Sequence, residues 1–136
     1  MLLILDSNEY LFGLGLTRQP ESEKLLEHLI EKYPLHQIRV PRLISEEVRR
    51  NLPPQTFSRF LQIVQTFTVI DEDSVVTFEL GARYEAMGLK AADAFIAAYT
   101  ECVGAEALIT ENRHFLIRRT DLPFKVLTAE QCLKLL

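Results

Sequence analysis

The sequence has few cysteines, no long apolar run and no excess of positive charge, and each of these absences excludes a class of protein. Only two of its 136 residues are cysteines, Cys102 and Cys132, and neither has a partner at metal-ligand spacing. We therefore expect reduced thiols rather than a disulfide framework or a zinc site. No apolar run approaches the roughly 20 residues that span a bilayer. The net charge of −4 excludes an overall basic surface, so a nucleic-acid ligand requires a local basic patch.

What remains is the composition of an ordinary globular protein, with 48% hydrophobic and 25% charged residues. A chain of this length fits a single domain, residues 1–136, with its own hydrophobic core. Met1 leads directly into a short apolar run without a basic segment before it, which predicts a first strand rather than a signal peptide. We expect a cytoplasmic protein without a membrane segment.

Short apolar runs alternate along the chain with segments of helical spacing. The expected strands are 2–5, 37–40, 67–70, 107–110 and 124–127. The expected helices are 20–32, 43–52, 56–65, a helix from Asp73 or Ser74 to Met87, 91–103, and a C-terminal helix from Thr128. Strands that alternate with helices indicate an α/β fold, with a central, mostly parallel sheet flanked by helices on both faces.

Acidic or amide residues occur where several of these apolar runs stop. In an open α/β sheet, ligands bind at the carboxyl ends of the strands, and a carboxylate at that edge is better placed for a cation than for stability. The residues in question are Asp6, Glu47, Asp93 and Asn112.

Each of these residues also has an ordinary structural explanation. Asp6 can cap a turn, and Asp93 can interact with the dipole of its helix. Glu47 shares a helical face with apolar residues and should point inward, whereas Glu46 should face solvent; backbone donors alone can satisfy an inward Glu. Asn112 can adopt a left-handed turn.

Two other motifs are rejected. Asp6 could be the nucleophile of a haloacid-dehalogenase-like phosphohydrolase, but the second acid of that motif is replaced by Asn8. Gly13 and Gly15 do not extend to a dinucleotide-binding fingerprint, because Arg18 stands where the third glycine is needed.

Taken together, the segments around the four polar residues resemble a PIN domain, the metal-dependent nuclease fold that is common among VapC-type toxins of prokaryotic toxin–antitoxin pairs. The resemblance spans most of the chain, and its pieces occur in the order and at the spacing of the family. The matching segments are Leu5-Asp6-Ser7-Asn8, Val40-Pro41 with Glu46-Glu47-Val48, Gly88-Leu89-Lys90 with 93–98, and 108–115.

The resemblance implies an acidic metal site formed by Asp6, Glu47 and Asp93. It also implies a catalytic role for Asn112, which stands where a fourth Asp often occurs, with Glu111 as the reserve ligand. Oxygen ligands without cysteine or clustered histidine favour Mg²⁺ or Mn²⁺.

The implied activity is that of an endoribonuclease, in which the metal binds a phosphate oxygen and lowers the pKa of a bound water. The choice of RNA over single-stranded DNA rests on the resemblance. Ser7 matches a small hydroxyl residue near the metal. The basic residues nearest the motifs are candidates for phosphate contacts or for a solvated surface: Lys90, Arg113, Arg118 and Arg119.

The resemblance also implies protein partners, namely an antitoxin or a second copy of the chain that forms a homodimer. Apolar residues of the helix 20–32, or those around Phe57, Phe60 and Leu61, are candidates for these contacts, although burial in the core explains them more simply. The alternative function is a PIN-like scaffold that binds RNA or protein without cutting.

Overall fold

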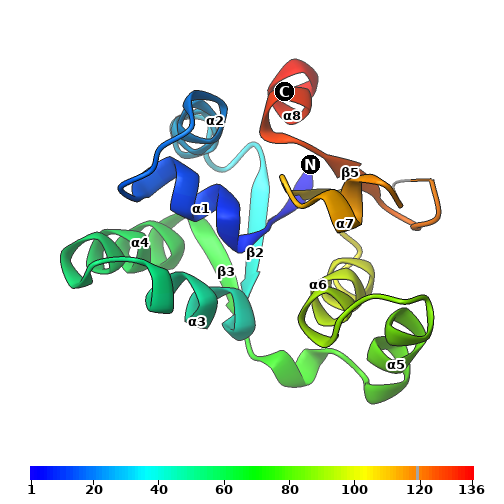
Figure 1. The fold of residues 1–136 in the computed structure, drawn as a ribbon. Helices are drawn as coiled ribbons and strands as arrows, with labels where there is room; N and C mark the ends of the chain where they lie inside the picture. The colour runs from blue at the N-terminus through cyan, green and yellow to red at the C-terminus, as the bar shows by residue number, and fades with distance from the viewer. Residues whose placement is uncertain (119) are drawn as a thin grey trace.

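The computed structural model describes residues 1–118 and 120–136. Five strands form one parallel sheet in the order β3-β2-β1-β4-β5 (Figure 1). The strands are β1 (Leu2–Leu5), β2 (Gln37–Pro41), β3 (Thr68–Asp71), β4 (Ala107–Ile109) and β5 (Lys125–Leu127). This confirms the expected α/β fold, and the sheet is parallel throughout.

Helices form the connections between the strands and flank the sheet. One group of helices, α1 to α4, packs together on one side, and α5 packs against α6 on the other side (Figure 1). Among the described residues, none of the helices is long and apolar enough to cross a bilayer. The helices are α1 (Ser7–Leu14), α2 (Pro20–Glu31), α3 (Arg42–Asn51), α4 (Pro54–Phe67), the 3₁₀ helix η1 (Asp73–Val75), α5 (Phe78–Ala86), α6 (Ala91–Cys102), α7 (Arg113–Leu116) and α8 (Ala129–Leu135).

The central strand β1 fixes the place where a ligand is expected to bind. Its residues 3–5 are at most 1% exposed, because the sheet is covered on both faces. The chain proceeds from β1 through β2 to β3 on one side and then returns to β4 and β5 on the other. The strand order therefore reverses between β1 and β4, and the crevice at their carboxyl ends is the topological switch point of the sheet.

The structure corrects three expectations about helices. The residues after Asp6, expected only to turn, form the helix α1. The single helix expected from Asp73 or Ser74 to Met87 is instead divided into η1 and α5, and Thr77 caps α5 by accepting a hydrogen bond from the Leu80 N–H. Asp73 serves another helix, because its carboxylate accepts the Leu43 N–H of α3 at 3.0 Å.

An ionic network fixes α6 to the sheet. The guanidinium of Arg39 on β2 donates two hydrogen bonds of 2.8 Å to the Asp71 carboxylate at the end of β3. The hydroxyl of Tyr99 on α6 donates a third, at 2.6 Å. The hydrogen bonds from Arg39 are the main reason why the pKa of Asp71 lies below its usual range. The network thereby sets the position of the helix whose first turn carries Asp93.

We expect Asp71→Ala to lower the free energy of unfolding by roughly 1–3 kcal/mol, because it leaves a half-buried guanidinium and a buried phenol without their acceptor. Tyr99→Phe should cost about 1 kcal/mol, since it removes one hydrogen bond. Urea unfolding of the variants measures both effects. The control is Glu46→Ala, which breaks an exposed ion pair and should change stability little. An Asp71→Ala variant as stable as this control would contradict the role of the network.

Candidate active site

Asp6 lies at the switch point and is held there by three hydrogen bonds. Its backbone N–H donates to the Ile109 carbonyl of β4 at 2.9 Å. Its carboxylate accepts the Ser7 N–H on Oδ1 and the Thr110 hydroxyl on Oδ2, both at 2.8 Å. The side chain thus caps α1 and bridges to the end of β4, which fixes one carboxylate in the crevice between the two strands.

Glu47 reaches the same region from α3. Its Oε2 accepts the Ser7 hydroxyl at 2.8 Å, so the side chain points toward the end of β1, as its helical face predicts. The neighbouring Glu46 faces outward and pairs with Arg49 at 2.7 Å. Ser7 therefore links two of the predicted acidic residues, with its N–H on Asp6 and its hydroxyl on Glu47.

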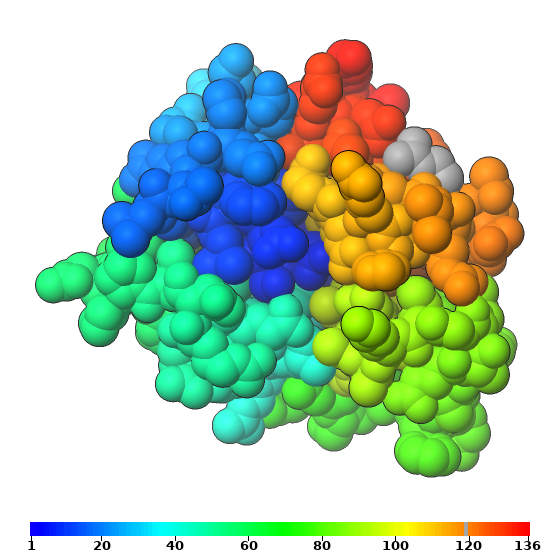
Figure 2. All heavy atoms as spheres, in the orientation of Figure 1, coloured from blue at the N-terminus to red at the C-terminus, as the bar shows by residue number. Residues whose placement is uncertain are grey.

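Asp93, the third predicted acid, lies in the first turn of α6. In the space-filling view of Figure 2, the start of α1 lies at the centre of one face, and α3, α6 and α7 surround it. The pKa of Asp6 is raised, mainly by burial and further by the negative charges of Glu47 and Asp93, while the hydrogen bonds from Thr110 and Ser7 oppose this. The charges of Glu47 and Asp93 therefore both act on Asp6.

The chemistry of this group suits a divalent cation, because carboxylate oxygens are the ligands that Mg²⁺ and Mn²⁺ prefer and a cation relieves their mutual repulsion. Within residues 1–118 and 120–136, however, no three acidic, histidine or cysteine side chains are arranged so that they could hold one ion. The sheet brings the donors to one edge, but the side chains stand apart in this conformation.

Asn112 lies beside this group and has a structural task of its own. It caps α7, since its Oδ1 accepts the His114 N–H at 3.0 Å. Its φ of −74° excludes the left-handed turn that was the alternative explanation. The catalytic role that the resemblance implies for Asn112 stays a prediction.

Glu111, the reserve ligand, interacts elsewhere. Its Oε2 accepts the Ala129 N–H at the start of α8, and its side chain meets Glu9 of α1. Glu9 is fully buried; its Oε2 accepts the Ser22 hydroxyl at 2.8 Å, while Oε1 accepts no hydrogen bond from a described residue. Burial, and then Glu111, raises the pKa of Glu9 to about 9, so near neutral pH Glu9 is a protonated acid.

Sequence reasoning missed both Glu9 and Thr110 as functional side chains. A sequence pattern could have pointed to Glu9, because an Asp at the N-cap followed three residues later by Glu is close to a capping box. Its carboxyl is nonetheless used for Ser22 and Glu111. Thr110 directly follows a fully buried strand, but only the pairing of β1 with β4 shows that its hydroxyl faces Asp6.

The basic residues separate into two sets. Lys90 and Arg118 line a cavity with Asp93 and His114, whereas Arg113 is exposed outside it. The remaining candidate, Arg119, lies outside the described residues. His114 lies in the short helix α7.

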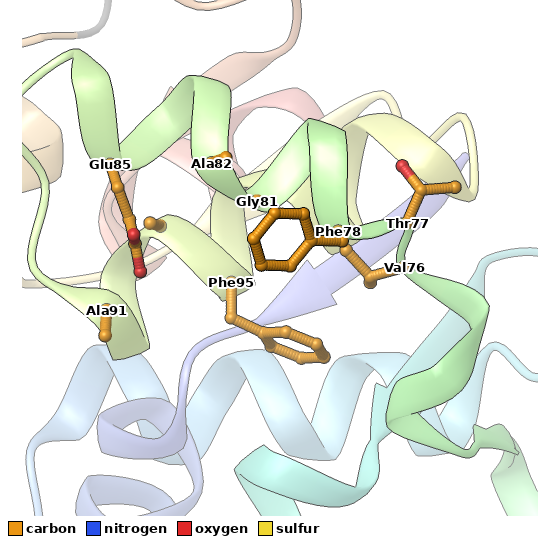
Figure 3. A pocket seen from close by; sticks show the side chains of 9 residues that line it. Val76, Thr77, Phe78, Gly81, Ala82, Glu85, Ala91 and Phe95 are labelled. Atoms are coloured by element: carbon orange, nitrogen blue, oxygen red, sulfur yellow. The ribbon is translucent and has the colours of Figure 1, made fainter.

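The apolar candidates for partner contacts are mostly part of the core. The buried positions include Leu25, Leu26 and Leu29 of α2 and Phe60 of α4. A larger apolar pocket, of about 250 Å³, lies between α5 and α6 and is lined by Phe78 and Phe95 among others (Figure 3). It contains no residue of the acidic group.

We expect Glu9→Gln to change how stability depends on pH. The folded chain retains a proton on Glu9 that the unfolded chain releases above about pH 4.5. The stabilisation from Glu9 is therefore complete below that pH and is lost progressively until about pH 9. Glutamine supplies a permanent N–H donor to Glu111, so near pH 9 the variant should be more stable than the wild type by roughly 1–3 kcal/mol. Urea unfolding across this range measures it.

The control for this measurement is Glu27→Gln, an exposed site in the middle of α2. It should follow the wild-type curve. If the stability of the wild type and of Glu9→Gln changed with pH in parallel, Glu9 would be ionised in the folded chain. Glu9 and Glu111 would then share no proton.

No protein-family model matches the sequence, and no curated protein sequence matches it. Solved structures do. VapBC2 from Rickettsia felis, bound to a DNA fragment from its promoter, is 19% identical, with a TM-score of 0.65 over 94% of this chain and 98% of the other. FitAcB from Neisseria gonorrhoeae is 17% identical, with a TM-score of 0.63 and the same coverage. VapBC-1 from nontypeable Haemophilus influenzae is 16% identical, with a TM-score of 0.60 over 96% and 99%.

At these identities the likeness concerns the fold. It extends over nearly the whole of each chain and includes the central parallel sheet with its flanking helices. The chain has the PIN-like fold of the VapC and FitB proteins, as the resemblance of its sequence predicted.

Proposed function

We propose that this protein is a metal-dependent endoribonuclease and the toxin of a toxin–antitoxin pair. The observation that carries the proposal is the position of Asp6, a buried carboxylate at the switch point of a parallel sheet, where the charges of Glu47 and Asp93 act on it. Such an arrangement opposes stability unless a cation binds there. In this proposal a strand of nucleic acid binds at this edge of the sheet, because ligands of open α/β sheets bind outside the carboxyl ends of the strands.

In this proposal Asp6, Glu47 and Asp93 hold Mg²⁺ or Mn²⁺. When bound, the ion supplies positive charge that stabilises the phosphate as its ester bond is hydrolysed. Ser7 and Thr110 orient the carboxylates, as hydrogen-bond donors to ligating groups do in other metal sites. Because burial raises the pKa of Asp6, a proton competes with the ion for this residue, and binding should strengthen as the pH rises.

The partner in the proposal is an antitoxin. The similar structures are VapBC and FitAB complexes, and one VapBC complex is bound to promoter DNA. This likeness supports a small protein partner that is encoded beside the toxin and blocks it.

The first test is the titration of Mn²⁺ into the purified protein by calorimetry. We expect the wild type to bind Mn²⁺ and Asp93→Asn to lose binding, because the substitution removes one anionic ligand. The matched control is Asp121→Asn, an exposed acid in the turn before β5, which should bind as the wild type does. The wild type should also cut single-stranded RNA in a Mn²⁺-dependent way, with Asp6→Asn slower by about two orders of magnitude or more.

A lack of Mn²⁺ binding at millimolar concentration in both the wild type and Asp93→Asn would contradict the nuclease proposal. The PIN-like binding scaffold would then be the better explanation. Cutting of DNA but not of RNA would support the proposed metal site but contradict RNA as the substrate.

A second test concerns Thr110 as a positioning residue. Thr110→Val keeps the side-chain shape but removes the hydroxyl that donates to Asp6. We expect Mn²⁺ affinity to fall by roughly 10-fold to 100-fold. Thr110→Ser retains the hydroxyl and should restore affinity, whereas a purely structural role would leave affinity unchanged in both variants while stability falls.

A further inference from the structure

The cavity beside Asp93 has features that the proposed metal site does not use. It lies between the start of α6 and the helix α7, and its volume is about 130 Å³. Lys90 and Arg118 provide two positive charges, His114 provides an imidazole, and Asp93 connects the cavity to the acidic group.

The positive charges of this cavity have no acid that neutralises them within the part of the chain that the structure describes. Five arginines elsewhere do form ion pairs with carboxylates: Arg18, Arg39, Arg42, Arg49 and Arg83. Lys90 and Arg118 form none among the same residues, although Asp93 lines the same cavity. Two unpaired cations around one concave surface are suited to an anion.

The backbone places Arg118 in this cavity. Gly88 has a φ of +97°, a conformation that L side chains rarely adopt. A Cβ at this position would lie 3.0 Å from Nη2 of Arg118, so the absence of a side chain leaves room for the guanidinium. Lys90 stands at the N-cap of α6, where the first N–H groups of the helix lack partners within it and add to the positive potential.

The size of the cavity selects among anions. Sites for drug-sized ligands begin at roughly 300 Å³, well above the space available here. A phosphate group fits better than a whole nucleotide, and a planar guanidinium is suited to binding two of its oxygens at once. The apolar Leu89 and the exposed Ile117 line the remainder of the wall, where a ribose can rest.

From these observations we infer that the cavity formed by Lys90, His114 and Arg118 binds an internal phosphate of the RNA strand next to the phosphate that is cut. This inference rests on the proposed function, because Asp93 belongs to both the cavity and the metal site. The phosphate site can nonetheless be tested separately from the metal site, because its contacts need no metal.

The test is the binding of a fluorescent oligouridylate with a 5′-hydroxyl end to the full chain in EDTA, at several salt concentrations. We expect Lys90→Gln and Arg118→Gln each to weaken binding severalfold and to reduce the slope of log K against log salt by about 1, as the loss of one phosphate contact does. Lys90→Arg should restore both. The control is Arg59→Gln, an exposed arginine of α4 that should bind as the wild type does. Lys90 is exposed, so its substitution tests the site without disturbing the core.

The metal and phosphate sites are separated by comparing two variants. Asp93→Asn should lose Mn²⁺ but bind the oligonucleotide at least as tightly as the wild type, because a negative charge beside the phosphate is removed. Arg118→Gln should keep Mn²⁺ binding and lose oligonucleotide affinity. Wild-type affinity and salt slope in both Lys90→Gln and Arg118→Gln would overturn the inference, even with Mn²⁺ binding intact. Binding confined to a 5′-phosphorylated oligonucleotide would also overturn it, since the cavity would then recognise a terminal phosphate.

Discussion

The pairing of β1 with β4 is the constraint on which the candidate site depends. The register that places Leu5 beside Ile109 also places the first residues beyond each strand side by side. Asp6 and Thr110 are then within one hydrogen bond of each other, and the helices that follow, α1 and α7, begin on the same edge. A shift of this register by one residue would separate Asp6 from Thr110.

Much of this arrangement is visible in the sequence, because the buried strands are short apolar runs and their ends carry polar residues. The inward direction of Glu47 follows from helical spacing alone. Thr128, where the C-terminal helix was expected to start, does cap α8, in a capping box with Gln131. The sequence does not show, however, which distant residues lie close together in the folded chain. The use of Asp73 by α3 and the meeting of Glu9 with Glu111 join parts of the chain that no local pattern connects.

The electrostatics of the site show two ways of keeping an acid inside a protein. Asp6 receives donors from Ser7 and Thr110, which favour its charged form against the cost of burial. Glu9, one turn further along α1, instead keeps its proton and lies against Glu111. The two carboxyls are therefore stabilised in different ways, and Asp6, whose hydrogen-bond donors favour the charged form, is the one suited to a cation.

The hydrogen bond between Thr110 and Asp6 joins residues 104 positions apart. Protein synthesis runs from the N-terminus, so Asp6 and Glu47 leave the ribosome long before β4 exists. Without β4, Asp6 has neither its backbone partner nor the Thr110 hydroxyl. A growing chain therefore carries the acidic residues without an assembled site, and the site arises late, when the sheet closes around β1.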